Sequence, residues 1–449
     1  MNVTFARFLA WGLLLFAIPV YGQDPAASWT VLPGAPIQVK IGRHEDVSFV
    51  SPVTGWVVNF SGEIFKTTNG GQTWARQLQA QTRTGFEVEF RSVGFANEQL
   101  GWAGSLTEGH MLYETRDGGQ TWQNISNKIT GADVAGLCGL WVVNEEVIYG
   151  VGRYMNPARL LKSTDGGQNW VAKDMSPLAE TLIDVFFFDE NHGFVVGGSH
   201  LTLSRGHAVV LETVDGGDTW VVRHTSSELA EWGWKISFPT PQTGYVSVER
   251  LNGAKVLKTT DGGQTWEEIS IPGSRPLQGI VFVNEDVGWA SGYGTTFKTT
   301  NGGGTWEQVT ELEGRINRFR MVNDTLGYAV GKMVYKYAGL VATGKEEPLL
   351  PEVSFRLDAN FPNPFAASTM IAYTLRQNAH VRLAIYDLLG RHVATLVEAR
   401  QGAGAHQVAW DGATEAGEAV RPGLYFYRLT ADDHVPTRPM MRISAAGLE

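Results

Sequence analysis

Short apolar runs separated by polar turns rich in glycine and threonine repeat along this chain as far as Tyr337. In each repeat, one apolar run leads into a glycine followed by an aromatic residue. Gly, Thr and β-branched residues disfavour helix, and no segment shows a convincing helical period. The pattern therefore predicts strands and tight turns. The markers are Gly55-Trp56, Gly101-Trp102, Ile148-Tyr149 (the variant of the third repeat), Gly193-Phe194, Gly244-Tyr245, Gly288-Trp289 and Gly327-Tyr328.

A second pattern is an eight-residue segment that recurs six times, from TTNGGQTW at 67–74 to TTNGGGTW at 299–306. Its tryptophans lie 48, 48, 50, 46 and 40 residues apart. This period is typical of one four-stranded blade of a β-propeller. The polar residue and the tryptophan of each segment are Asn69 and Trp74, Asp117 and Trp122, Asp165 and Trp170, Asp215 and Trp220, Asp261 and Trp266, and Asn301 and Trp306.

Seven markers but six recurring turns indicate that the last repeat, Arg320 to Tyr337, lacks its final turn and strand. The segment Ser28 to Pro36 resembles the strand that follows such a turn, as in Thr265 to Gly273. Pairing of the two chain ends in one blade would remove open sheet edges. We therefore expect an all-β, seven-bladed propeller over residues 24–339, closed by strand exchange.

The recurring turn has its own chemistry. Its Asp or Asn side chain can accept backbone N–H bonds across the turn, the two glycines supply positive φ, and the Trp packs between blades. Calcium binding by the Asp residues is the functional alternative. Each turn offers one carboxylate, whereas calcium usually collects six to eight oxygens, so we predict a structural role, no metal and no cofactor.

After Tyr337 the pattern ends in a Pro-rich and charged stretch, VATGKEEPLLPE, which predicts a linker over 340–353. A second domain over 354–445 follows. Its alternating segments predict a small antiparallel, Ig-like sandwich. These segments are Thr369 to Leu375, Val381 to Tyr386, His392 to Val397, His406 to Trp410 and Gly423 to Thr430.

Composition narrows the function. A net charge of -10 and a pI near 5.6 over 449 residues argue against a nucleic-acid partner. Arg7 and the apolar run Phe8 to Val20, with Gly22 beyond, predict a signal peptide over 1–22 and no transmembrane segment after its removal. Cys138 is the only cysteine, so no intramolecular disulfide can form, and its apolar neighbours predict a buried thiol.

The loops opposite the recurring turns vary most in length, and loops on a rigid scaffold are where binding usually resides. The insertions at 105–111, 153–159, 199–208, 226–235 and 249–254 carry cations and tryptophans that we expect to be exposed. Taken singly, each is more simply an ordinary solvated loop residue. Together they predict a peptide- or glycan-binding face made of His110, Arg153, Tyr154, His200, Arg205, His207, Glu231, Trp232, Trp234 and Arg250.

The recurring turn resembles the Asp-box, or BNR repeat, of sialidases, sortilin-like receptors, xyloglucan-degrading enzymes and photosystem II assembly-factor-like propellers. The resemblance implies that the boxes are structural and lie far from the central binding face. The Phe-Arg-Ile-Pro segment of sialidases is absent. Arg315, Arg318 and Arg320 alternate on one predicted strand and cannot be assigned to a carboxylate clamp. The loop acids Glu108, Asp184 and Glu231 lie in no recognised catalytic motif, so no catalytic residue is assigned.

The segments NFPNPF at 360–365, IYDLLGR at 385–391, WDG at 410–412 and GLYFY at 423–427 together resemble a type A C-terminal sorting domain of the type IX secretion system. A plain Ig-like adhesion module is the alternative. The resemblance implies Bacteroidota-like bacteria, the type IX machinery as a partner, and passage through the periplasm to the cell surface or the medium. The chain departs from the pattern by continuing with AAGLE after Ser444.

We therefore expect a secreted or surface-displayed, non-catalytic propeller that binds an unidentified protein or glycan through its loop-rich face. Two alternatives stay open. One is a sialidase-like or endoglucanase-like glycoside hydrolase. The other is an assembly scaffold like the photosystem II factors, which fits the repeats but not the predicted export tail.

Overall fold

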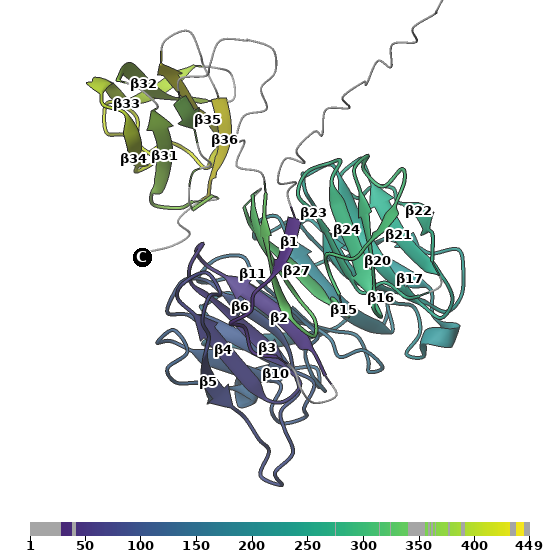
Figure 1. The fold of residues 1–449 in the computed structure, drawn as a ribbon. Helices are drawn as coiled ribbons and strands as arrows, with labels where there is room; N and C mark the ends of the chain where they lie inside the picture. The colour runs from purple at the N-terminus through teal and green to yellow at the C-terminus, as the bar shows by residue number, and fades with distance from the viewer. Residues whose placement is uncertain are drawn as a thin grey trace, which may run out of the picture. The chain divides into compact units, whose positions relative to one another are not determined.

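The computed structural model divides the chain into two compact units, Met1–Val341 and Ala342–Glu449 (Figure 1). The predicted signal peptide (1–22) and linker (340–353) lie outside the described residues. The structure describes residues 28–37, 42–273, 275–313, 315–323, 325–339, 355–357, 360, 362–363, 365–375, 378–387, 391–431 and 437–443.

The described strands of the first unit form seven sheets, six with four strands and one with five. In chain order, the first sheet contains β2 (His44–Phe49), β3 (Gly55–Asn59), β4 (Glu63–Thr67) and β5 (Ala75–Gln79), and the second contains β6 (Phe90–Phe95), β7 (Gly101–Ser105), β8 (Leu112–Thr115) and β9 (Gln123–Asn124). The third contains β10 (Ile129–Gly131), β11 (Gly139–Val142), β12 (Ile148–Val151), β13 (Arg159–Ser163) and β14 (Trp170–Asp174). The fourth contains β15 (Thr181–Phe187), β16 (Gly193–Gly198), β17 (Ala208–Thr213) and β18 (Val221–Thr225).

The other three sheets follow the same plan, with β1 joining strands from the far end of the unit. They are β19 (Glu231–Ser237), β20 (Gly244–Arg250), β21 (Ala254–Thr259) and β22 (Glu267–Ile271); β23 (Gly279–Phe282), β24 (Gly288–Gly292), β25 (Thr295–Thr299) and β26 (Glu307–Val309); and β27 (Arg318–Asn323), β28 (Leu326–Val330) and β29 (Val334–Ala338) with β1 (Ser28–Val31). All of these pairings are antiparallel except the parallel pair of β10 and β14.

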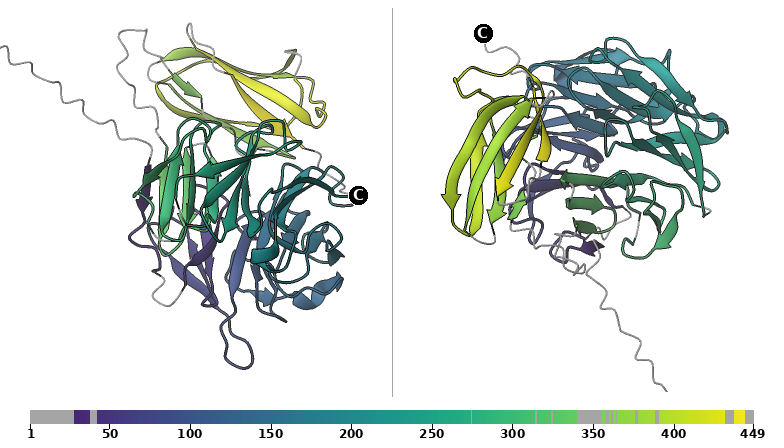
Figure 2. Two further views of the ribbon diagram at one scale, coloured as in Figure 1. Left: turned by 90° about the vertical axis from the view of Figure 1, so that its right-hand side faces the viewer. Right: turned by 90° about the horizontal axis from the view of Figure 1, so that it is seen from above.

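The first strand of each sheet contacts the first strand of the next. Strand β2 contacts β6, and the series continues through β11, β15, β19, β23 and β27, which in turn contacts β2 (Figure 2). The series of contacts therefore returns to the sheet where it began. Strand β1 pairs with β29 in antiparallel register, and Trp29 is buried with its ring centroid 5.3 Å from that of Phe319.

Neighbouring sheets are joined by a repeated aromatic contact that explains the glycine–aromatic marker. In four sheets, a phenylalanine on the first strand lies against the marker glycine of its own sheet, at a distance where a Cβ would come within 2.3–2.5 Å of the ring. The same ring stacks on the marker aromatic of the preceding sheet, with centroids 3.5–3.7 Å apart. The four sets are Phe49, Gly55 and Tyr328; Phe95, Gly101 and Trp56; Phe187, Gly193 and Tyr149; and Phe282, Gly288 and Tyr245.

A polar contact accompanies the aromatic one. The Tyr149 hydroxyl and Lys162 Nζ donate to the carbonyl of Gly216, in the box of the next sheet, at 2.9 and 2.8 Å. Tyr328 makes the same bond to Gly70 at 3.2 Å, which ties the last sheet of the unit to the first box. These two boxes are thus bound by the sheet that precedes them.

The predicted chemistry of the boxes is confirmed. Asp117 Oδ1 accepts the N–H of Thr121 at 2.9 Å, and both box glycines have positive φ in all six segments. Hydrogen bonds from Thr121, first from its side chain and then from its backbone, lower the pKa of Asp117 to about 2. The motif tryptophans are buried or half-buried, and Trp74 packs edge-on against Phe49. The polar atoms of the box are therefore used inside the turn.

The second unit forms two antiparallel sheets around one apolar core that includes Tyr373, Ile385 and Trp410. Each of the five predicted segments falls within an observed strand, which confirms a small antiparallel sandwich. One sheet contains β30 (Phe355–Leu357), β31 (Thr369–Leu375) and β34 (Gly404–Trp410). The other contains β33 (His392–Gln401), β32 (Ala379–Asp387), β35 (Gly423–Ala431) and β36 (Thr437–Arg442).

Two other expectations concern helices and the thiol. The helical elements of the described residues are two short 3-10 turns, Ser126–Lys128 and Leu203–Arg205. The Cys138 side chain is fully buried, as predicted. No helix in the described part of the chain is long and apolar enough to span a membrane.

The glycine–phenylalanine contact predicts the effect of adding one methyl group. Replacing Gly193 with Ala places a Cβ about 2.4 Å from the Phe187 ring and should lower the free energy of unfolding by about 1–3 kcal/mol. Urea denaturation measures this. Gly304→Gln is the control, because four of the other five boxes carry Gln at this position. Equal stability of Gly193→Ala and the wild type would contradict the proposed role of the contact.

Candidate functional site

A pocket of about 400 Å³ lies where the inner strands of the first unit begin. We call it the loop-side pocket, since the segments that enter the inner strands and the loops after the second strands form its wall. Six of the seven sheets, with the loops next to them, contribute the charged and aromatic side chains discussed below. The lining residues are Gly42, Arg43, Glu45, Phe60, Arg91, Tyr154, Met155, Leu203, Trp232, Trp234, Glu249, Gln278, Tyr293 and Arg315.

Aromatic rings form one side of this pocket. Trp232 and Trp234 lie on β19, and Tyr154 follows β12 with its ring centroid 5.9 Å from that of Trp234. The expectation that both tryptophans are exposed is wrong, because Trp232 is 2% and Trp234 4% exposed. Their indole N–H groups donate inward, Trp232 to the carbonyl of His200 and Trp234 to Asn317 Oδ1, each at 3.0 Å.

Buried arginines face the aromatic side. The Arg91 guanidinium lies 5.4 Å from the centroid of Trp234 and pairs with Glu45. Arg43 Nε donates to Glu45 at 2.8 Å, and Arg43 Nη2 donates to Asn317 at 3.2 Å. Burial lowers the pKa of Arg43 and that of Arg91 to about 10, which leaves both charged at neutral pH. Two cations thus share one carboxylate at the pocket wall.

The opposite rim carries a second polar set. Tyr293 donates to Glu249 at 2.9 Å, and Gln278 Nε2 donates to the same carboxylate at 3.0 Å. The Arg315 guanidinium lies 4.4 Å from the Tyr293 ring centroid. Burial, followed by the charge of Glu249, raises the pKa of Tyr293, so its hydroxyl stays protonated. The rim therefore presents a cation beside an anchored ring.

Three residues of the predicted binding face line this pocket, namely Tyr154, Trp232 and Trp234. Glu231 is fully buried instead, and pairs with Lys255 at 2.8 Å and with Arg250 at 3.5 Å. The remaining five predicted residues do not line the pocket. His110 bonds to Tyr113, Arg153 donates to the Leu106 carbonyl, His200 accepts the N–H of Thr202, and His207 bonds to the Ser226 carbonyl. Arg205 is exposed.

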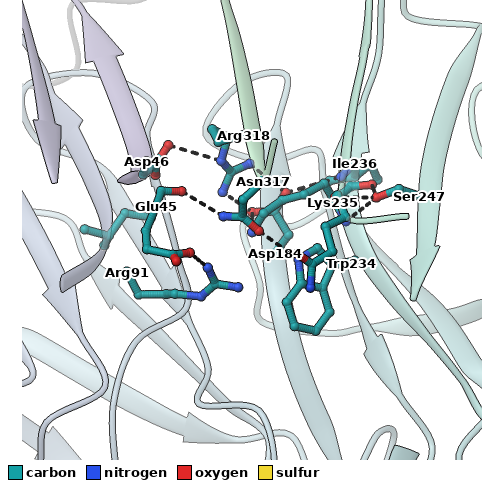
Figure 3. Close-up of polar contacts among 12 residues, drawn as sticks. Glu45, Asp46, Arg91, Asp184, Trp234, Lys235, Ile236, Ser247, Asn317 and Arg318 are labelled. Carbon is teal, nitrogen blue, oxygen red and sulfur yellow. Dashed lines mark hydrogen bonds and ion pairs between the residues drawn. The ribbon is translucent and has the colours of Figure 1, made fainter. Parts of the chain in front are cut away.

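Below the loop-side pocket, charged residues from four sheets meet among the inner strands (Figure 3). Arg318 donates to both oxygens of Asp184, at 2.7 and 2.9 Å, and its Nε lies 3.1 Å from Asp46. Lys235 Nζ lies 3.6 Å from Asp184 Oδ1. All four side chains are at most 4% exposed. The network joins strands that are far apart in the sequence.

This network includes Asp184, one of the three loop acids considered for catalysis. Burial of Asp184 opposes its ionisation, but the charges of Arg318 and Lys235 outweigh burial and lower its pKa to about 2. A carboxyl group held ionised in this way is unsuited to donate a proton near neutral pH. Glu231 is held by Lys255, and Glu108 lies on an exposed loop. No pair of these three acids faces the loop-side pocket.

The three arginines near 318 also differ from expectation. They do not alternate along one strand, because Arg315 precedes β27 and lies over Tyr293 at the rim of the loop-side pocket. Arg318 is bound by two aspartates, and the Arg320 guanidinium lies 5.1 Å from the centroid of Trp141. They therefore do not form a three-arginine clamp.

The sequence analysis named Asp184 and Arg318 but missed the network that they form with Asp46 and Lys235, although a signal was present. Asp46, Asp184, Lys235 and Arg318 each lie nine residues before the marker glycine of their repeat, and each is followed by an apolar residue. A charge at that position is costly to bury unless it is paired. Comparison of the repeats at equivalent positions would have placed these residues together. Among the described residues, no group of three or more His, Cys, Asp or Glu is arranged to hold a metal ion.

Comparison with solved structures defines the class of protein. The chain resembles "YCF48 bound to D1 peptide", with 18% identity, a TM-score of 0.53 and coverage of 71% of this chain and 99% of that one. It also resembles YCF48 from Cyanidioschyzon merolae, with 17% identity, a TM-score of 0.52 and coverage of 70% of this chain and 99% of that one. The GH74 xyloglucanase of Xanthomonas campestris is similar with 12% identity, a TM-score of 0.52 and coverage of 94% of this chain and 76% of that one. At these identities the likeness shows the fold, so the first unit is a β-propeller of BNR-type repeats.

Family comparison then identifies the chain more closely. The family model described as photosynthesis system II assembly factor YCF48 matches residues 27–174 and 175–330, so the chain belongs to this family. The photosystem II assembly lipoprotein Ycf48 of Nostoc sp. is 26% identical over 226 residues, which are 49% of this chain and 57% of that protein. The chain thus spans less than two thirds of this curated relative. Residues 365–434 match an FlgD Ig-like domain.

The buried network predicts a coupled response to mutation. Asp184→Asn leaves Arg318 with Asp46 and removes the carboxylate that pairs with Lys235, so it should lower the free energy of unfolding by about 3–5 kcal/mol. Adding Lys235→Met restores the original net charge of the network and should recover part of the loss. Urea denaturation of the single and double variants measures the coupling. Simple additivity of the two changes would contradict the described network.

Proposed function

We propose that this protein is a non-catalytic binding propeller that holds a peptide segment of another protein in the loop-side pocket. The observation that carries the proposal is the lining of that pocket, where buried aromatic rings face arginines supplied by several sheets. Rings bound in place lose little entropy on binding, and arginine pairs well with carboxylates. An extended peptide with an apolar side chain and a nearby carboxylate fits this lining.

A peptide is favoured over a glycan because of how the rings are held. The indoles of Trp232 and Trp234 are buried and hydrogen-bonded inward, so neither presents an open flat face on which a sugar could stack. The relative solved with D1 peptide supports a peptide ligand, and the likeness to the xyloglucanase supports the fold alone. Family membership supports a role in protein assembly. It does not identify a photosystem subunit as the partner of this chain.

We further propose that the scaffold is a seven-bladed propeller closed by β1. The pairing of β1 with β29 and the contact of β27 with β2 support closure. A closed scaffold would fix the pocket walls in the absence of ligand and reduce the ordering cost of binding. The absence of a recognised catalytic motif and the pairing of Asp184 and Glu231 with cations support a binding role over hydrolysis.

The route of export is a separate proposal. The predicted signal peptide and the resemblance of the C-terminal segments to a type IX sorting domain support transport through the periplasm to the cell surface or the medium. The match to an Ig-like domain agrees with a small β-sandwich in this region but leaves the route open. In this proposal the second unit is a sorting signal, and the type IX machinery is the partner that recognises it.

Peptide binding is tested on an array of peptides and oligosaccharides with the purified chain. We expect peptides with an apolar residue near a carboxylate to bind, and Tyr154→Ala or Arg315→Gln to weaken binding at least tenfold. Both residues lie at the rim, so these variants keep the buried tryptophans. Arg205→Gln, on an exposed loop outside the pocket, is the control. Binding of xyloglucan fragments alone, or of peptides with no effect of either variant, would refute the proposal.

Export is tested by mass spectrometry of the medium, the surface and the cell interior of an organism that encodes the chain. We expect peptides from residues 28–339 outside the cell, and peptides from the second unit either confined to the interior or found at the surface. Removal of residues 354–449 should leave the first unit inside the cell. Unchanged export after this truncation would rule out the sorting role.

A further inference from the structure

We propose that a second pocket, at the opposite end of the inner strands, binds a small carboxylate carried on a flat apolar group. This site is independent of the loop-side pocket and of the function proposed for it. It has a volume of about 330 Å³, within the range of small-molecule sites. We call it the box-side pocket, because it lies where β19, β23 and β27 end and the chain turns toward the boxes.

The position follows from the direction of the strands. Along β19, Trp232 and Trp234 line the loop-side pocket, while Lys235 and the residues after it line the box-side pocket. Likewise, Arg315 before β27 belongs to the first pocket, and Arg318 and Arg320 belong to the second. Of the residues labelled in Figure 3, Glu45, Arg91 and Trp234 line the loop-side pocket, and Lys235, Ile236 and Arg318 line the box-side pocket.

One wall of the box-side pocket is aromatic. Trp141, Phe186 and Phe238 form a continuous series, with centroids 4.6 Å apart for the first pair and 5.2 Å for the second. All three rings are partly exposed, unlike the tryptophans of the loop-side pocket. The last pair is nearly parallel, with an interplanar angle of 27°. This wall can accept a flat apolar group by stacking.

The other wall is cationic. Lys235, Arg318 and Arg320 line the pocket, and the carboxylates within ion-pair distance of them are Asp46 and Asp184. Three cations against two carboxylates leave one positive charge in excess. An excess charge in a mostly buried site is costly, and one bound anion would balance it.

Lys235 is the cation with unused capacity. Its Nζ is buried, lies 3.6 Å from Asp184, and has no hydrogen-bond acceptor among the described residues. An ammonium group has three donors, and a buried donor without an acceptor is costly. Arg318, by contrast, is bound by both aspartates. A carboxylate in the pocket would supply Lys235 with the acceptor that it lacks.

The protonation of Lys235 makes this site sensitive to pH. Burial, and then the charge of Arg318, lower the pKa of Lys235 to about 7, although Asp184 on β15 and Asp46 on β2 oppose the shift. Arg91 on β6 acts with Arg318 on β27 to lower it. Lys235 is therefore largely charged below pH 7 and largely neutral above it. Since an anion binds the charged form better, affinity should fall as the pH rises through 7.

Isothermal titration calorimetry with 3-phenylpropanoate tests the site on the full chain. The neutral amide, 3-phenylpropanamide, has the same ring and serves as the matched ligand. We expect the acid to bind at least tenfold more tightly than the amide at pH 6, and its affinity to fall at least fivefold by pH 8.5. At pH 8, binding should take up a proton, which is measured by comparing buffers of different ionisation enthalpy.

A second titration, with peptides, distinguishes two sources of the carboxylate, a protein C-terminus and a small metabolite. Gly-Gly-Phe with a free C-terminus is compared with its amidated form. Binding of the free peptide as well as of the small acid would indicate the C-terminus of a protein, whereas binding of the acid alone would indicate a metabolite. Either result supports a carboxylate site.

Two variants assign the binding to this pocket. Lys235→Met removes the excess charge, leaves Asp184 paired with Arg318, and should weaken acid binding at least tenfold and abolish its pH dependence. Arg320→Gln is the second variant, at a partly exposed position where the fold is less at risk. Arg76→Gln, on β5, is the control and should not change binding. Equal affinity for acid and amide, absence of acid binding, or binding that neither variant weakens would overturn the proposal.

Discussion

The first unit depends on a phenylalanine ring that lies against a glycine of its own sheet and stacks on an aromatic residue of the sheet before it. Phe187, Gly193 and Tyr149 show the geometry, with a Cβ excluded on one side and a ring 3.7 Å away. The contact needs glycine because any side chain would displace the ring. The hydroxyl of Tyr149 then reaches the next box, so one aromatic residue joins two sheets by packing and by hydrogen bonding. Because the same contact links Phe49 to Tyr328, it connects the first sheet with the last.

Sheets joined in this way leave the inner strands free to carry different residues at one repeat position. Four of these positions hold Asp46, Asp184, Lys235 and Arg318, and the same position in the other three repeats holds Ser92, Gly139 and Gly279. The charges therefore occupy positions that the repeat itself does not specify. Lys235 and Arg318 of this network line the box-side pocket, and the loop-side pocket lies at the other end of the inner strands. One pocket has fixed rings and paired arginines, and the other has partly exposed rings and an unsatisfied ammonium.

Much of the fold could be predicted from the sequence because its cause is local. The box turn uses side chains and glycines within eight residues, and the sandwich strands of the second unit show simple alternation. The strand Ser28–Val31 was recognisable because it resembles residues after other boxes. The candidate functional site was harder to predict from the sequence. Trp232 and Trp234 lie in a segment that looks like an inserted loop, but they belong to the inner strand β19 and are buried. Arg43 and Arg91 come together only through the arrangement of separate sheets, which no local pattern encodes.

Native-state hydrogen exchange tests the central claim most directly, since it reports the opening free energy of each sheet. If the aromatic contacts found in four sheets, including the contact between the first sheet and the last, hold the unit together, strand amides of β2–β4 and β27–β29 should exchange with the same high opening free energy as those of β15–β17 and β19–β21. A clearly lower opening free energy for the sheets at the two ends of the unit would show that they are not joined. The account of both pockets would then fail.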